Sequence, residues 1–183
     1  IGVYSSNMPS ASSENSYASY QGTSMAAPAV TAVFALWQQY FKELNSFVGL
    51  QNMKAASLKA LMAHTASEAG VYKDRVLPPL VAENVTSPEG PDPRFGWGVI
   101  NAEGGAKVLQ DAFSDTPTAV FKELVLSNGV DYVLDVTLNG TEKLNATIAW
   151  TDLPAEAVSI DDSVVPVLVN DLDLRIYGPG DTS

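Results

Sequence analysis

The sequence contains no cysteine, a single histidine and few basic residues. Its 183 residues include 10 Lys and Arg against 21 Asp and Glu, which gives a formal net charge of −11. The lack of cysteine excludes disulfides, zinc–thiolate sites and thiol nucleophiles. The negative charge repels phosphate backbones and anionic lipids, so we expect no nucleic-acid partner and no membrane surface. No apolar run approaches the roughly 20 residues that span a bilayer, so we expect no membrane span.

The residues that are present are sufficient for a hydrophobic core. Hydrophobic residues make up 46% of the chain, and its length suits one domain or two small ones. The first residue is Ile1 rather than methionine, and no signal peptide precedes it. We therefore expect a processed product or a piece of a longer protein.

Apolar residues recur at intervals of three and four in the first part of the chain and are expected to form inward faces, at Ala27, Val30, Phe34, Trp37 and Phe41 and again at Leu58, Leu61 and Met62. This period predicts a helix over about 25–41, with Pro28 tolerated in its first turn, and a second helix over 57–66. A long loop rich in Pro and Gly is expected over 70–98, followed by a short helix over 102–113.

The hydrophobic period changes from 3.6 to 2 beyond residue 118. Alternation over 130–138, 143–151 and 171–177 predicts strands, and Asn139 with Gly140 is the favoured pair for a two-residue hairpin turn. Because each predicted strand has one polar face, the pattern favours an antiparallel sandwich rather than a parallel sheet.

Ser24 stands at the start of the first predicted helix and has two interpretations. Serine is a preferred N-cap residue, so Ser24 can serve only to begin the helix. A helix start also points unpaired N–H groups and partial positive charge toward a developing oxyanion. Gly22 removes a side chain just before the serine and allows close approach by a substrate. A serine nucleophile further needs a base and a group that orients the base.

Residues 22–28, "GTSMAAP", resemble the nucleophile motif Gly-Thr-Ser-Met-Ala-x-Pro of the subtilisin-like serine proteases, or subtilases. The segment "SLKALMAHTA" and the turn "DPRFGWGVINA" are similar to later elements of the catalytic domain in that family. "WTDLP" and "LVNDLDLRIYGPG" resemble a β-sandwich that some larger subtilases carry. The family often has histidine after the motif proline, where this chain has Ala29.

The resemblance implies a fold and a reaction. Residues 1–113 would be the C-terminal portion of an α/β subtilisin-like catalytic domain, and 114–183 an incomplete, jelly-roll-like antiparallel β-sandwich. The chain would belong to a serine endopeptidase that hydrolyses polypeptides through an acyl-enzyme on Ser24. The backbone N–H of Ser24 would be an oxyanion donor, with Thr23 and Gly22 contributing to oxyanion or substrate binding.

The rest of the catalytic triad is not found in the expected place. Subtilases order the triad Asp, His, Ser, yet the residues before Ser24 contain no Asp or His, and Asn7 and Asn15 lie too close to it to be the second oxyanion donor. The sole histidine, His64, falls in a predicted helix, where packing is the more typical role. The chain alone is therefore expected to be inactive. Its implied partner is an N-terminal part of the same protease that carries the catalytic Asp, His and oxyanion Asn.

No cofactor is needed for this chemistry, although the resemblance implies that a structural calcium ion, with unknown ligands, is an option. Asp171 and Asp173 share one strand face, but two carboxylates fall short of the about six to eight oxygens that calcium takes. We identify no metal ligands. Three N-x-T sequons, at Asn84, Asn139 and Asn145, are candidate glycosylation sites and indicate a secreted, extracellular or vacuolar protein.

Two alternatives to the protease remain at this point. One is a catalytically inactive subtilase-fold protein, or pseudoenzyme, in which Ser24 only caps a helix. The other is a β-sandwich binding module with a helical neighbour, which leaves "GTSMAAP" unexplained.

Overall fold

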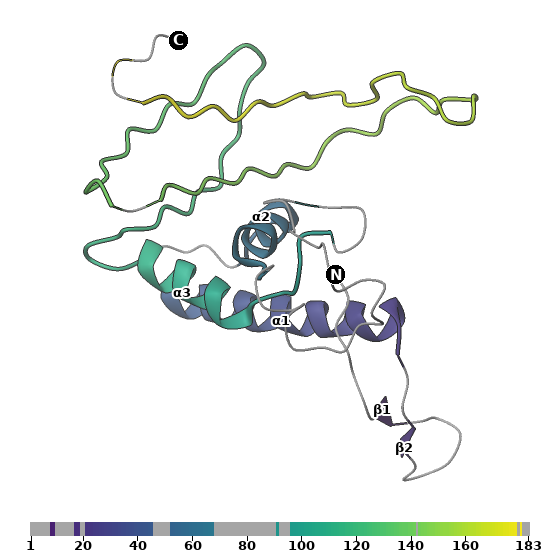
Figure 1. The fold of residues 1–183 in the computed structure, drawn as a ribbon, viewed down its shortest axis with the longest axis horizontal. Helices are drawn as coiled ribbons and strands as arrows, with labels where there is room; N and C mark the ends of the chain where they lie inside the picture. The colour runs from purple at the N-terminus through teal and green to yellow at the C-terminus, as the bar shows by residue number, and fades with distance from the viewer. Residues whose placement is uncertain are drawn as a thin grey trace, which may run out of the picture.

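The structure is a computed structural model that describes residues 8–9, 17–18, 21–45, 52–67, 91, 96–141, 143–178 and 180. Its elements are the strands β1 (Met8–Pro9) and β2 (Tyr17–Ala18) and the helices α1 (Thr23–Leu44), α2 (Ala55–Thr65) and α3 (Ala102–Ala112). The two short strands pair antiparallel, with Met8 opposite Ala18. Figure 1 shows the three helices packed together and the chain beyond α3 lying on one side of them.

All three predicted helices are confirmed, with one correction to the first. Helix α1 begins at Thr23, two residues earlier than expected, so Pro28 is its sixth residue and lies beyond the first turn. Proline has no N–H, so the helical hydrogen bond from residue 28 to the Ser24 carbonyl cannot form. The first and second turns of α1 are therefore joined by one hydrogen bond fewer than the same turns of a helix without proline.

The core lies at the C-terminal half of α1, where α3 runs alongside it and α2 packs against α3 (Figure 1). The buried apolar residues come from all three helices and the loop before α2: Trp37, Phe41, Met53, Leu61 and Leu109. The sequence pattern placed Trp37, Phe41 and Leu61 on inward faces, and this is confirmed. By contrast Ala27, expected on the same face, is exposed.

Trp37 joins α1 to the first turn of α3. Its side chain is 1% exposed, and its Nε1 donates a hydrogen bond of 2.9 Å to the carbonyl of Ala102. The absence of a side chain at Gly105 makes room for the ring, because a Cβ there would lie 2.2 Å from Trp37 Cζ2. The sequence "AEGGA" thus permits this close helix contact, which a larger residue at position 105 would prevent.

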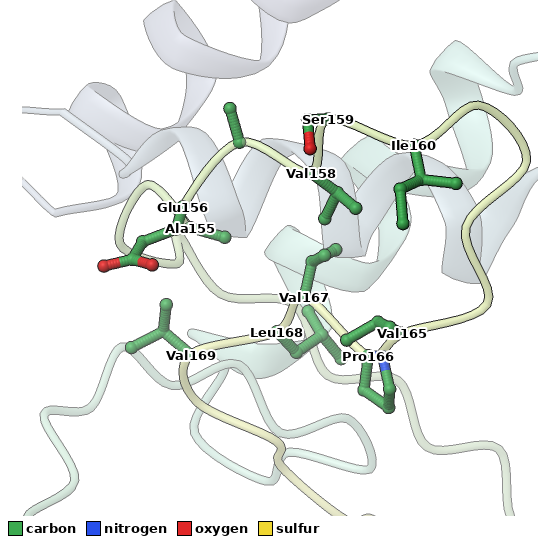
Figure 2. A pocket seen from close by; sticks show the side chains of 11 residues that line it. Ala155, Glu156, Val158, Ser159, Ile160, Val165, Pro166, Val167, Leu168 and Val169 are labelled. Atoms are coloured by element: carbon green, nitrogen blue, oxygen red, sulfur yellow. The ribbon is translucent and has the colours of Figure 1, made fainter.

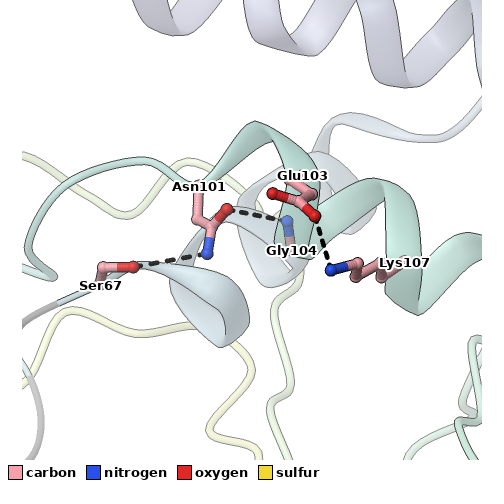
Figure 3. A network of polar contacts seen from close by, with 5 residues as sticks. All are labelled: Ser67, Asn101, Glu103, Gly104 and Lys107. Atoms are coloured by element: carbon pink, nitrogen blue, oxygen red, sulfur yellow. Dashed lines mark hydrogen bonds and ion pairs between the residues drawn. The ribbon is translucent and has the colours of Figure 1, made fainter.

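Two polar clusters fix the chain segments around the core. The Gln38 amide exchanges two hydrogen bonds with the backbone of Met53, at 2.9 and 2.8 Å. Asn101 caps α3, since its Oδ1 accepts from Gly104 N at 2.8 Å, and its Nδ2 donates to Ser67 Oγ at 3.4 Å (Figure 3). Such caps satisfy backbone N–H groups that a helix leaves unpaired.

The predicted fold class is wrong. The described residues contain three helices and one two-residue strand pair, so neither an α/β sheet nor a β-sandwich is seen. Among the described residues 115–141 and 143–177, a single backbone–backbone hydrogen bond forms, from Val130 N to Ser127 O. These segments run extended without strands (Figure 1).

The physical reason is that alternation favours an extended backbone but does not by itself make a sheet. A sheet also needs hydrogen bonds between strands and a second layer that covers the apolar face. Here the apolar side chains are not covered: Val133 is 77% exposed, Val125 88% and Val164 95%. The boundary between residues 113 and 114 stays a prediction.

The extended part is nevertheless attached to the helices through side chains that include those of Phe121 and Glu123. Phe121 packs edge-on against Phe41, with 5.9 Å between ring centroids. Glu123 accepts hydrogen bonds from Lys54 N, at 2.7 Å, and from Ser57 Oγ. Helix α2 has no cap from its own N-cap side chain, so the Glu123 carboxylate stabilises its positive end from a segment much later in the chain.

A carboxylate also holds two parts of the extended segment together. Asp152 accepts hydrogen bonds from Val169 N at 2.8 Å and from Asn170 Nδ2 at 2.7 Å, as well as from Leu153 N at 2.9 Å. Desolvation acts to raise the pKa of Asp152, but the hydrogen bonds from Asn170, Val169 and Leu153 together outweigh it and lower the pKa. The charged form of Asp152 is therefore the one that joins these segments.

Candidate active site

The motif predicted to carry the nucleophile lies at the start of α1. Gly22 is the N-cap, with φ 136° and ψ 178°, a backbone conformation found almost only at glycine. Its carbonyl accepts hydrogen bonds from Met25 N at 3.1 Å and Ala26 N at 3.2 Å. The chain therefore turns sharply into the helix at Gly22 and presents the next two residues at the helix tip.

Ser24 is the second residue of α1 and its side chain is exposed. The N-cap is Gly22, and no side chain makes a capping hydrogen bond there. The interpretation of Ser24 as a helix cap is therefore wrong. The hydroxyl is left available at the surface, whereas the side chain of Ala26, two residues further along the helix, is 1% exposed.

The electrostatics of this turn favour an anion. Within the described part of the chain, the N–H groups of Thr23 and Ser24 make no hydrogen bond. The first turn contains no acidic residue, although acids are favourable at that position in most helices because they complement the helix dipole. Within the described residues, no side chain of this turn therefore compensates the positive end of α1 beside the Ser24 hydroxyl, and a positive helix end can stabilise a developing oxyanion.

Replacing Gly22 with alanine tests whether this backbone conformation matters. No atom of the described residues lies within 4 Å of a Cβ built on Gly22, so the substitution creates no steric clash with that part of the chain. The expected cost is backbone strain alone, about 1–3 kcal/mol for a residue held in this region. We expect the first turn to relax and labelling of Ser24 by a serine-reactive fluorophosphonate probe to fall, while the helical circular dichroism of the whole chain changes little.

A Gly129→Ala variant is the matched control, since Gly129 also has positive φ, at 74°, with open space around it. It should cost similar stability without affecting Ser24. Equal labelling of Ser24 in the Gly22→Ala variant and the unmodified protein would contradict the role given to Gly22.

The remaining functional groups do not assemble around Ser24 in the described residues. His64 is part-buried near the end of α2, and its Nδ1 lies 3.0 Å from Thr147 Oγ1, so it makes a structural contact with the extended segment. Of the two candidate calcium ligands, Asp173 pairs with Arg175 at 2.8 Å. No group of three or more metal-ligating side chains is found where the structure describes the chain.

A pocket of about 450 Å³ lies elsewhere, between residues 155–160 and 165–169 of the extended segment (Figure 2). Its lining is mostly Val, Ala, Leu and Ile, with Glu156 as the only ionisable side chain. Because no residue of α1 contributes to it, this pocket is not part of the site at Ser24.

The candidate glycosylation sites divide by position. Asn139 and Asn145 are exposed, which leaves them sterically accessible, whereas Asn84 lies outside the described residues. Thr147, the third residue of the Asn145 sequon, contacts His64.

As for membranes, none of the described helices combines the length and the hydropathy that a bilayer crossing requires.

Sequence reasoning missed several groups that shape this molecule. Glu123 was not singled out, because nothing in its sequence neighbourhood indicates that it reaches a helix 69 residues away. The sequence predicted unpaired N–H groups at the start of the helix. It did not identify Thr23 and Ser24 as the two residues whose N–H groups make no hydrogen bond within the described residues. Asn101 could have been found, since asparagine before a helix is a common cap.

Comparisons with known proteins support the motif. The model of the subtilase family, peptidase S8, matches residues 3–98, more than half of the 183 residues. No curated protein and no solved structure matches the chain. The matched range includes the whole of "GTSMAAP" and both α1 and α2. The chain therefore belongs to the subtilase family, a family of serine-type proteases.

Proposed function

We propose that this chain provides the nucleophile of a serine endopeptidase, with Ser24 as the attacking residue. The single observation that carries the proposal is the state of the first turn of α1. The motif serine is exposed there and does not cap the helix. It stands beside two N–H groups that no described residue accepts from, in a turn without an acidic residue. A serine with a purely structural role would have no need for this combination.

The proposed reaction is attack of the Ser24 hydroxyl on a peptide carbonyl. A base on another segment takes the Ser24 Oγ proton as the oxygen attacks the scissile carbonyl carbon. Negative charge then develops on the carbonyl oxygen, where the Ser24 N–H and the α1 dipole stabilise it. The amine leaves with the proton, and water cleaves the acyl-enzyme and restores the hydroxyl. Thr23 and Gly22 line the approach of the peptide.

The base, the group that orients it and a second oxyanion donor come from outside this chain. We assign them to an N-terminal part of the same protease that carries the Asp, His and Asn. The exposed residues of the first two turns of α1 support such a partner: Thr23, Ser24, Ala27 and Pro28. These small side chains leave room for a second segment to approach the serine closely. The chemistry needs no cofactor, and we propose a secreted or vacuolar location on the basis of the sequons.

The test is covalent labelling with a fluorophosphonate probe on material purified from its natural source, followed by peptide mapping. We expect the probe on Ser24, because such reagents react with serines that have an assembled base and oxyanion hole. No label on material whose circular dichroism shows intact helices would contradict the proposal and favour a subtilase-fold protein without activity.

A further inference from the structure

An exposed Asn-Gly pair, Asn128 and Gly129, lies in a turn that follows the first extended segment. Ser127 O accepts a hydrogen bond of 3.1 Å from Val130 N, which closes a four-residue turn. Gly129, the third residue of the turn, has φ 74°, the positive value that a type II turn requires at that position. Asn128 and Gly129 are both exposed.

We infer that Asn128 is a site of spontaneous deamidation through a succinimide formed with Gly129. The backbone nitrogen of Gly129 loses its proton and attacks Cγ of the Asn128 side chain. The new N–Cγ bond closes a five-membered ring, and ammonia leaves from Cγ. Water then opens the ring at either carbonyl and yields aspartate or isoaspartate, so the net change is addition of water and loss of ammonia, with no oxidation or reduction.

The structure supplies the conditions that this ring closure needs. Gly129 has no side chain, and nothing lies within 4 Å of the position where a Cβ would be, so the attacking nitrogen is unhindered. Within the described residues neither the Gly129 N–H nor the Asn128 amide makes a hydrogen bond. Both groups are therefore free to rotate toward each other in water.

Two other asparagines in the described part of the chain, Asn101 and Asn170, lack these conditions and serve as internal controls. The Asn101 amide is held at both ends, by Gly104 N at 2.8 Å and Ser67 Oγ at 3.4 Å, and Ala102 follows it inside a helix. The Asn170 amide donates to Asp152 at 2.7 Å. These hydrogen bonds hold each amide away from the following backbone nitrogen.

Asn139 precedes Gly140, which has φ 85°, and shares the exposed geometry of Asn128. Unlike Asn128, it begins an N-x-T sequon. A glycan on Asn139 would occupy the amide nitrogen that must leave, whereas Asn128 has no sequon to protect it. Asn128 is therefore the position that converts whether or not the chain is glycosylated.

The consequence for the molecule is a change of charge and of backbone at one turn. Each event adds one negative charge to a chain whose formal net charge is already −11. Isoaspartate also inserts a methylene into the backbone, which the Ser127–Val130 hydrogen bond cannot accommodate without rearrangement. Aged protein would thus be a mixture of species that differ in the segment between α3 and the Asp152 cluster.

The experiment is incubation of the full chain at mildly alkaline and mildly acidic pH, with peptide mapping by mass spectrometry over time. We expect the Asn128 peptide to gain the mass of an amide-to-acid change and to split into aspartate and isoaspartate forms, faster at alkaline pH. The Asn101 and Asn170 peptides should lag behind it. Equal conversion of all three peptides in the folded chain would overturn the inference.

Two variants test whether conversion depends on ring closure between Asn128 and Gly129 or on exposure of Asn128 alone. Asn128→Gln keeps the amide but lengthens the side chain, so the five-membered ring cannot form and the mass gain should be lost. Gly129→Ala keeps Asn128 and hinders the attacking nitrogen, so conversion should slow in the folded chain and also in the chain unfolded by denaturant. Unchanged conversion in Gly129→Ala under both conditions would show that Gly129 is not the attacking group.

Discussion

Replacement of Ser24 with alanine in the assembled protease is expected to abolish peptide hydrolysis. Loss of the nucleophile lowers kcat of subtilisin by about six orders of magnitude, and we carry this magnitude over from that enzyme. The hydroxyl that attacks the carbonyl is removed, while the helix dipole and the N–H of residue 24 remain. The measurement is kcat on a peptide substrate, with the binding of a peptide inhibitor as a second readout that should change little.

The stability of the Ser24→Ala variant should be close to that of the unmodified protein. Ser24 is exposed and makes no capping hydrogen bond, and surface substitutions of this kind change stability by about 0.5 kcal/mol or less. Thr31→Ala is the matched control, because it also removes an exposed hydroxyl from α1. The Thr31 hydroxyl donates a hydrogen bond to the Ala27 carbonyl of the same helix. If both variants lose activity equally, the loss comes from damage to α1 and not from the nucleophile.

Replacement of Trp37 with alanine should have the largest effect on stability. Trp37 is 1% exposed, stacks on Phe34 with 5.8 Å between ring centroids, and donates to the Ala102 carbonyl. Loss of a buried tryptophan costs about 3–5 kcal/mol, a large share of the about 5–15 kcal/mol that stabilises a typical domain. We expect the chain to lose helical circular dichroism at much lower denaturant concentration.

Trp97→Ala provides the comparison for this variant. Trp97 is 41% exposed, so its removal should cost about 1 kcal/mol. Trp37→Phe retains most of the ring volume but leaves the Ala102 carbonyl without its donor, at a cost of about 0.5–1.5 kcal/mol for the hydrogen bond. Similar unfolding midpoints for the Trp37→Ala and Trp97→Ala variants would refute the placement of Trp37 at the centre of the core.

The helices could be predicted from sequence because their signals are local. The spacing of Trp37 and Phe41 fixes the buried face of α1, and "GTSMAAP" marks where the helix begins. The position of Pro28 could not be judged in the same way, because it depends on the residue at which the helix starts. That start is set by the backbone of Gly22, whose φ of 136° is permitted by the sequence but not specified by it.

The extended part could not be predicted because pairing between strands is not local. Alternating residues such as Val130 and Tyr132 favour an extended backbone whether or not a neighbouring strand exists. The attachments of this part are likewise invisible in sequence, since Glu123 and Thr147 reach α2 from 66 and 83 residues away. For the candidate site, the sequence indicated Ser24, and the structure adds that the serine is not a cap.

Helix α1 carries its large buried side chains and its candidate nucleophile in opposite halves, with Trp37 and Phe41 in the core and Ser24 in the first turn. Substitutions in the two halves of this helix therefore affect different properties of the protein. Substitutions near Trp37 are expected to alter how much of the protein is folded, while substitutions near Ser24 are expected to alter the proposed reaction. An engineer could raise heat tolerance by redesigning the last turns of α1 without changing turnover, a freedom that enzymes with catalytic groups inside the core do not have.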